Sequence, residues 1–205
     1  MSLSQPVAPE GAKPSTSDRS DEILGLVRTA FARKGFDGTS MNDLAREVGM
    51  SVGNFYRYFP SKNALVEALV AHDIAEIEAR FTLVLAAEDS LAALRMGLGE
   101  YLLTMEHDKC RLIAEISAAA QRATEVAATC ARLEEMAAEQ LLGVFTKHSG
   151  LAPEECRARF GAHARYIVLV IHGFGHRSNP HPDPDLNILI LRGINRVLDE
   201  IPAKG

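Results

Sequence analysis

The chain has 205 residues, of which 47% are hydrophobic, and a formal net charge of −5 at pH 7. This composition supplies enough apolar residues for a full core. The sequence contains no uninterrupted run of about 18 apolar residues, which argues against a transmembrane helix. Residues 1–62 hold eight Lys/Arg against seven Asp/Glu, whereas the remainder holds fourteen against twenty, so the first part repels a polyanion less. The cysteines, Cys110, Cys130 and Cys156, lack any C-x-x-C pairing, so we expect buried thiols and neither a disulfide framework nor a zinc site.

The first segment, residues 1–17, contains three prolines and no apolar run, which predicts a flexible tail. Nothing in it resembles a signal peptide, so we expect a cytoplasmic protein with no membrane partner. The first helix should begin near residues 18–21 and carry Ile23 and Phe31 on its apolar face. Gly35 should end it, because glycine accepts the left-handed backbone that closes a helix.

Two short helices should follow. Ser40 and Asp43 have the spacing of a capping box, which predicts a helix over 41–48. Ser51 can cap a second helix over 52–58, which the proline two residues later ends. Three residues join the two helices, and this layout is typical of a helix-turn-helix, whose second helix can lie in a DNA major groove.

The rest of the chain repeats apolar residues at steps of three and four, which predicts an all-α fold of about nine helices. Ser61 should cap a long fourth helix. The only pronounced break is the segment 176–185, with three prolines. The later helices are expected at roughly 90–107, 110–121, 124–148, 154–175 and 185–200.

The segment Val52–Pro60 holds four of the chain's twelve aromatic residues, which is too many for a short helix to bury on one face. Phe55 and Phe59 are four residues apart and should pack inward. Tyr56, Arg57 and Tyr58 are then left for the opposite surface. The pattern predicts a helix with one face in a core and one face available to a partner.

Through the helix-turn-helix layout and the segment Val52–Pro60, the first part of the chain resembles the DNA-binding domain of the tetracycline-repressor-like (TetR) family of transcriptional regulators. The resemblance implies a helix-turn-helix domain over 18–62 and a larger helical domain for effector binding and dimerisation over 63–205. The matching positions are Ile23-Leu24, Phe31, Gly35-Phe36, Thr39-Ser40, Asp43-Leu44-Ala45, Val48-Gly49-Met50-Ser51, Gly53, Phe55-Tyr56, Phe59, Ser61-Lys62 and Leu65.

In such a domain the second helix of the motif reads bases. Asn54 can make a bidentate pair with adenine and Arg57 with guanine, while tyrosine hydroxyls and Lys62 suit phosphate oxygens. Each of these residues also has a plainer interpretation, as a helix cap or a solvated polar face. The expected DNA-contacting residues are Thr39, Ser40, Ser51, Val52, Gly53, Asn54, Tyr56, Arg57, Tyr58 and Lys62, with Arg46 as a further candidate.

The resemblance also implies a homodimer formed by the last two helices, about 154–175 and 185–200, although the same apolar residues would suit an intramolecular core. A small-molecule effector would bind in an apolar pocket and favour one setting of the fourth helix, so that the two DNA-binding domains no longer match the operator. The candidate pocket residues are Tyr101, Met105, Ile113, Ile116, Phe145 and Tyr166, with Glu115, Arg122, His163 and Arg165 as polar anchors. For each of them a position in the core or on the surface is the alternative.

The expected function is therefore a ligand-responsive regulator, by default a repressor, that binds a palindromic operator in double-stranded DNA. We expect no enzyme and no cofactor, because the chain has no G-x-S-x-G, H-E-x-x-H, P-loop or dinucleotide-binding motif. Two alternatives stay open. His172 and His176 have the i, i+4 spacing of metal ligands, with His181 in the loop after them, which would suit a metal-responsive regulator. The other alternative is a DNA-binding protein without an effector.

Overall fold

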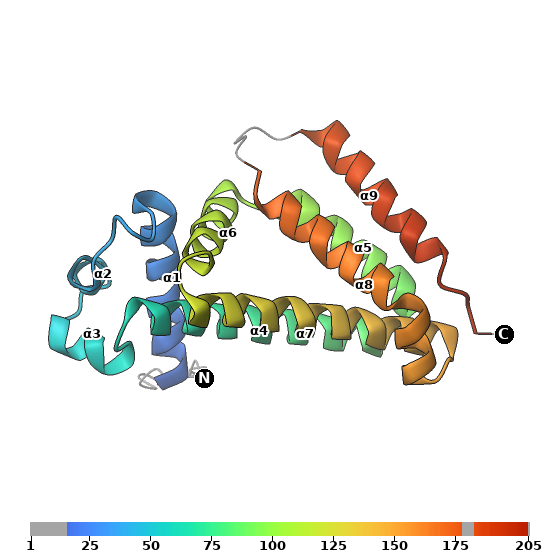
Figure 1. Ribbon diagram of the computed structural model, residues 1–205, viewed down its shortest axis with the longest axis horizontal. Coiled ribbons are helices and arrows are strands. Elements are labelled where there is room, and N and C mark those ends of the chain that lie inside the picture. Colours follow the sequence, from blue (N-terminus) through green and yellow to red (C-terminus); the bar gives the residue numbers. More distant parts are fainter. Residues whose placement is uncertain (1–15, 178–182, 205) are drawn as a thin grey trace, which may run out of the picture.

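The computed structural model describes residues 16–177 and 183–204, and all regular structure within them is α-helical (Figure 1). The predicted tail over 1–17 lies almost entirely outside the described residues, and so does His181. The expectation of an all-α fold with about nine helices is confirmed for the described part of the chain. Its helices are α1 Thr16–Lys34, α2 Met41–Glu47, α3 Val52–Tyr58, α4 Lys62–Ala86, α5 Ser90–Thr104, α6 His107–Ala120, α7 Thr124–Ser149, α8 Pro153–Gly175 and α9 Pro184–Asp199.

Local signals in the sequence determine the first helices. Ser40 accepts the backbone N–H of Asp43 while the Asp43 carboxylate accepts the backbone N–H of Ser40, so the predicted capping box is present. Ser51 caps α3 by accepting the N–H of Asn54, without the reciprocal bond of a capping box. Gly35 ends α1 with a φ of 78°, a left-handed value that glycine adopts without strain.

Helices α1, α2 and α3 form a small domain at one end of the molecule, which we call the head (Figure 1). Phe31, Leu44 and Phe55 are fully buried at its centre. Its hydrophobic core continues into the first half of α4 and onto α6, where Leu112 and Ile116 belong to the same cluster. The head therefore shares its core with helices that follow it in the sequence.

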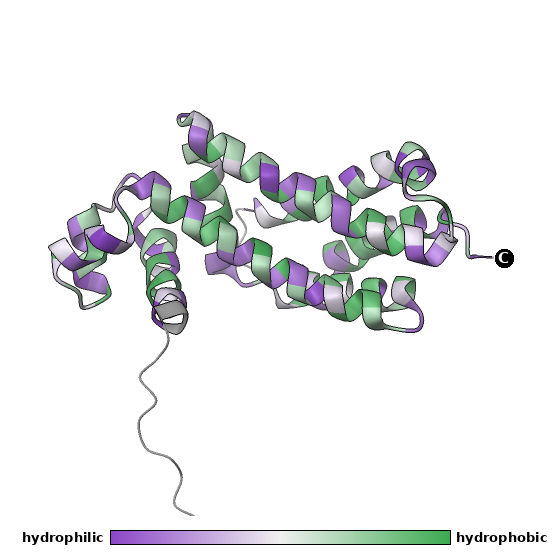
Figure 2. Ribbon diagram, turned by 90° about the horizontal axis from the view of Figure 1, so that it is seen from below, coloured by the Kyte–Doolittle hydropathy of each residue, from purple (hydrophilic) through white to green (hydrophobic). Residues whose placement is uncertain are grey.

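The remaining helices form the body. Helices α4 and α7 run side by side along its length, and α8 packs against α7 (Figure 1). A second hydrophobic core lies here, with Phe145, Ile167, Ile194 and Leu198 completely buried. Apolar and polar residues recur along each helix, as amphipathic packing requires (Figure 2). Among the described residues, no helix is long and apolar enough to cross a membrane.

Most predicted boundaries agree with the structure to within two residues, but the connection between α5 and α6 lies elsewhere. Helix α5 ends at Thr104 and α6 begins at His107, whereas the sequence placed the break near residues 108–109. Met105 and Glu106 have extended backbones, and no glycine or proline marks them. Asp108 instead lies in the first turn of α6, where a carboxylate interacts favourably with the helix dipole.

Candidate nucleic-acid interface

Helix α3 separates its aromatic residues between two faces. Phe55 is 0% exposed and Phe59 is 6% exposed, with their ring centroids 5.5 Å apart in the head core. On the other face Tyr56 is 43% and Tyr58 36% exposed. The spacing of four residues between the two phenylalanines produces this division, as the sequence predicted. A seven-residue helix thus presents two tyrosines to solvent on a firmly packed base.

The beginning of α3 is open to a partner. Val52 is 42% exposed, and Asn54 and Arg57 are also exposed. Beyond its chain neighbours and the backbone of its own helix, a Cβ atom at Gly53 would meet no atom within 4 Å, so packing within the chain does not explain a glycine there. A glycine costs helix stability, and its absence of a side chain would allow a base edge or phosphate to approach closely. The face can therefore make polar contacts through Asn54 and Arg57.

The structure places Thr39 differently from the other expected contact residues. It is only 1% exposed, and its hydroxyl donates a hydrogen bond to the carbonyl of Gly35 at 2.7 Å. Its side chain braces the turn between α1 and α2. The sequence contained no signal for this role, because a threonine before a helix is equally suited to a phosphate contact.

Lys62 lies at the first position of α4 and is partly buried. Its ammonium donates to the carbonyl of Phe36 at 2.6 Å and lies 4.9 Å from the centre of the Phe36 ring. An ammonium has three N–H donors, so one contact leaves others for a phosphate. Ser40 and Ser51 are exposed but act as helix caps, so both interpretations of these serines fit their positions.

Charged residues of α2 and of the end of α1 lie close together in the head. A hollow is lined by Lys34, Asp43, Arg46 and Glu47. Hydrogen bonds from Ser40 lower the pKa of Asp43, and those from Arg33 and Lys34 lower the pKa of Glu47. Both carboxyl groups are therefore ionised at neutral pH and balance the cations around them. The Arg46 side chain is 80% exposed and can reach outward.

The six candidate pocket residues do not meet in one place. Ile116 is part of the head core, Phe145 is part of the body core, and Tyr166 is 45% exposed on α8. Ile113 lies against Gly175 of α8, where an added Cβ would come within 2.8 Å of its Cδ1. Met105 packs at the edge of the body core.

Tyr101 lies beside charged residues of two other helices. Burial raises its pKa to about 12, with a smaller contribution from the negative charge of Asp73 on α4. Lys109 of α6 lies over its ring, with Nζ 5.1 Å from the centroid. The phenol therefore stays neutral and can donate a hydrogen bond at the junction of α4, α5 and α6.

Three of the four candidate polar anchors are already engaged. Glu115 accepts the backbone N–H of Phe36 at 2.7 Å, and Arg122 pairs with Asp37 at 2.6 Å. Both contacts join α6 and its end to the head. His163 lies 2.9 Å from a Glu200 carboxylate oxygen instead. The fourth candidate anchor, Arg165 on α8, is exposed.

The two histidines at the end of α8 lie close together, with ring centroids 4.5 Å apart. Nδ1 of His172 is 3.1 Å from Glu134, and burial lowers the pKa of His172. Both ring nitrogens of His176 lie within hydrogen-bond distance of oxygens, the His172 carbonyl at 2.8 Å and the Ser117 hydroxyl at 2.9 Å. The histidine pair is thus accounted for by contacts that link α6, α7 and α8.

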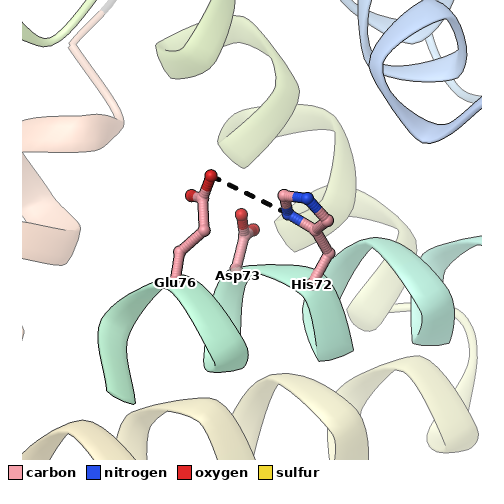
Figure 3. Close-up of side chains that lie close together, drawn as sticks. All are labelled: His72, Asp73 and Glu76. Atoms are coloured by element: carbon pink, nitrogen blue, oxygen red, sulfur yellow. Dashed lines mark ion pairs between the residues drawn. The ribbon is translucent and has the colours of Figure 1, made fainter. Parts of the chain in front are cut away.

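A cluster of His72, Asp73 and Glu76 projects from one side of α4 and has the residue types of a metal site (Figure 3). The guanidinium of Arg28 on α1 supplies a positive charge to it, 2.6 Å from Asp73 and 3.4 Å from Nδ1 of His72. Arg28 also donates to the carbonyl of Leu69. We interpret the cluster as an ion-pair network that fastens α1 to α4.

Comparisons with known proteins agree with this arrangement. The family described as bacterial regulatory proteins, tetR family, matches residues 23–69. The HTH-type transcriptional regulator YvdT of Bacillus subtilis is 33% identical over 98 residues, covering 46% of this chain and 49% of the relative. The HTH-type transcriptional regulator EthR of Mycolicibacterium smegmatis is 34% identical over 100 residues, covering 46% of each. The matches thus span about half the length of these two relatives.

The similarity to solved structures extends over nearly the whole chain. A TetR transcription regulator from Haloarcula marismortui has a TM-score of 0.71 at 17% identity, covering 90% of this chain and 98% of that one. A TetR-family regulator from Agrobacterium tumefaciens has a TM-score of 0.67 at 22% identity, with 91% and 99% covered. At these identities the likeness concerns the fold, in which a helical body carries a helix-turn-helix head.

Proposed function

Because the chain belongs to the TetR family of bacterial regulatory proteins, we propose that it is a DNA-binding transcriptional regulator and not an enzyme. The observation that carries this proposal is the division of α3 into a buried and an exposed face. Arg57 and Asn54 are the proposed base-reading residues, and Tyr56, Tyr58 and Lys62 the proposed phosphate contacts. Thr39 is left out of the proposed contacts because it is buried.

We propose further that it binds as a homodimer. The head carries nearly balanced charge, so a single copy would have little net electrostatic attraction to DNA. Two heads on one face of B-DNA would read a palindrome with half-site centres ~34–36 Å apart, or a multiple of this. Pairing of the two binding events would then supply the affinity that a single head lacks.

Helices α8 and α9 offer the surface for this dimer. Leu169 on α8 is 68% exposed and Leu189 on α9 is 64% exposed, and Leu186, Ile188 and Tyr166 are exposed as well. Leaving several large apolar side chains in water is unfavourable, and covering them with a second copy would remove this cost. The other faces of the same two helices form part of the intramolecular core, where Ile167 and Ile194 are buried.

A small-molecule effector is the finer part of the proposal. We place its binding site near Tyr101, where α4, α5 and α6 meet and a neutral phenol lies beside the charged Asp73 and Lys109. An effector bound there would act by favouring one arrangement of α4 and α6, and repression relieved by such a ligand is the mode we propose.

The test is a selection of bound sequences from a random pool of DNA duplexes, followed by affinity measurements over a salt series. We expect a palindrome to be enriched. Arg57→Ala should relax the preference at one position of each half-site, whereas Lys62→Ala should weaken all sequences alike and reduce the salt slope by ~0.9 for each phosphate that is no longer neutralised. Arg132→Ala, which removes an exposed charge on α7 outside the head and outside the proposed α8–α9 interface, is the matched control and should leave both properties unchanged. If no sequence is enriched at any salt concentration, the proposal of a sequence-specific regulator is wrong.

A further inference from the structure

Residue Phe36 is held from two sides by charged residues that lie far apart in the sequence. Its backbone N–H donates to Oε2 of Glu115, on α6 of the body, at 2.7 Å. Its carbonyl accepts from Nζ of Lys62, at the beginning of α4, at 2.6 Å. The main chain at Phe36 therefore connects a carboxylate of the body to a lysine that we expect to contact DNA.

The surroundings keep Phe36 in one position. Phe36 is 8% exposed, and its ring lies 5.3 Å from the ring of Phe31, centroid to centroid. The preceding Gly35 has a φ of 78°, and a Cβ atom there would be 3.2 Å from Oε2 of Glu115, so the glycine also leaves room for the carboxylate. The Thr39 hydroxyl ties the Gly35 carbonyl down. The Phe36 carbonyl is thus a fixed acceptor for Lys62.

We propose that Glu115 is a positioning residue for DNA binding, which acts through Phe36 to hold the Lys62 ammonium in place for a phosphate. This inference rests on the proposed function. A lysine side chain loses considerable conformational freedom when it is ordered, so a lysine held beforehand gives up less entropy when it contacts DNA. One N–H of the ammonium binds the carbonyl of Phe36, and the others serve the phosphate.

The position of Glu115 gives the contact a regulatory consequence. Glu115 belongs to α6, in the body, and it reaches 79 residues back along the chain to the head. A displacement of α6 would withdraw the carboxylate from Phe36 and loosen the acceptor that holds Lys62. The head would then lose affinity without any change in α3 itself.

The neighbouring contact between α6 and the head provides a matched control. Arg122 pairs with Asp37, the residue after Phe36, at 2.6 Å, and both side chains are more than half exposed. This ion pair also joins the end of α6 to the head, but it does not touch the Phe36 main chain. Its removal tests whether docking of α6 alone matters.

The experiment compares operator affinity for the full-length wild type and for Glu115→Ala, Glu115→Gln, Arg122→Ala, Lys62→Ala and the double variant Glu115→Ala with Lys62→Ala. Glu115→Ala should weaken binding by about 3- to 10-fold, the coupling typical of residues in one network. Charge alone predicts the opposite, because losing a carboxylate reduces repulsion of DNA. Glu115→Gln loses the same charge but keeps an acceptor for the Phe36 N–H, so it should bind no more weakly than the wild type.

The double variant is decisive. If Glu115 acts through Lys62, the two substitutions together should weaken binding no more than Lys62→Ala alone, and Arg122→Ala should not reproduce the effect of Glu115→Ala. Amide exchange at Phe36 should accelerate in Glu115→Ala while the melting temperature shows that the protein is folded. If Glu115→Ala does not fold, Glu115→Met, which retains the volume without a strong acceptor, replaces it.

Additive losses in the double variant, or unchanged affinity in Glu115→Ala, would overturn the inference while leaving the proposed function intact. Absence of specific binding by the wild type would instead remove the proposed function.

Discussion

Substitution by alanine should have different effects at two adjacent aromatic residues on α3. Phe55→Ala should mainly reduce stability, and Tyr56→Ala should mainly reduce DNA affinity. Phe55→Ala should lower the free energy of unfolding by about 3–5 kcal/mol, the range for removing a fully buried phenylalanine ring. The loss should fall in the upper half of this range, because the ring also pairs with Phe59 at 5.5 Å and such pairs add about 0.5–1.5 kcal/mol. A helix of seven residues has little stability of its own to compensate.

Tyr56→Ala removes a ring of similar size from the exposed face of the same helix. With 43% of Tyr56 already in water, the cost should stay within about 0.5–1 kcal/mol, close to that of ordinary surface substitutions. Its effect should be on DNA affinity instead, through loss of the hydroxyl that we assign to a phosphate.

The assay is urea unfolding followed by far-ultraviolet circular dichroism, at one protein concentration because a dimer's stability depends on concentration. Operator affinity is then measured under conditions where each variant is fully folded. Equal destabilisation by Phe55→Ala and Tyr56→Ala would contradict the division of α3 into two faces. So would a Tyr56→Ala protein that binds the operator as tightly as the wild type.

Three further outcomes are expected. Gly35→Ala should lower stability by about 1–2 kcal/mol in thermal unfolding, because alanine is strained at a φ of 78°; an unchanged melting temperature would contradict this. Leu169→Glu should convert a dimer to monomers in analytical ultracentrifugation, whereas Leu103→Glu, at an equally exposed leucine on α5, should leave the dimer intact; equal behaviour of the two variants would count against the α8–α9 interface. The Asp43 carboxyl has its pKa lowered by Ser40, so the stability it contributes is present above its ordinary, unfolded-state pKa and is lost as the pH falls through its lower folded-state pKa. Asp43→Asn should therefore lose less thermal stability than the wild type on acidification through this range, and parallel pH profiles would refute the assignment.

The helices of the head could be predicted from the sequence because their signals are local. Ser40, Asp43 and Ser51 satisfy backbone donors within three residues of themselves, and Gly35 ends its own helix. Such signals act through neighbouring atoms and leave a fixed pattern in the chain. The burial of Phe55 followed equally directly from helical periodicity.

The functional side chains were harder to predict wherever their partners are distant in sequence. Glu115 and Arg122 were candidate effector anchors because they are polar residues in an apolar region, but both reach into the head, 79 and 85 residues away. Ile116 and Phe145 have the same apolar character, yet they belong to different cores. A periodic pattern shows that a residue faces inward, and the packing of the helices determines which interior it joins.

The shared core of the head has a consequence for building hybrid regulators. Exchanging DNA specificity between relatives by joining their chains after residue 62 would separate Phe31 and Leu44 from the α6 side chains that complete their packing. The exchanged head would then pack against the α6 of another protein through a buried interface, and the Phe36 N–H could lose its acceptor on α6. The part of the protein that must be exchanged to transfer DNA specificity is therefore not continuous in sequence. It comprises the head, the first turns of α4 and the side of α6 that faces the head, and a functional chimera has to include all three.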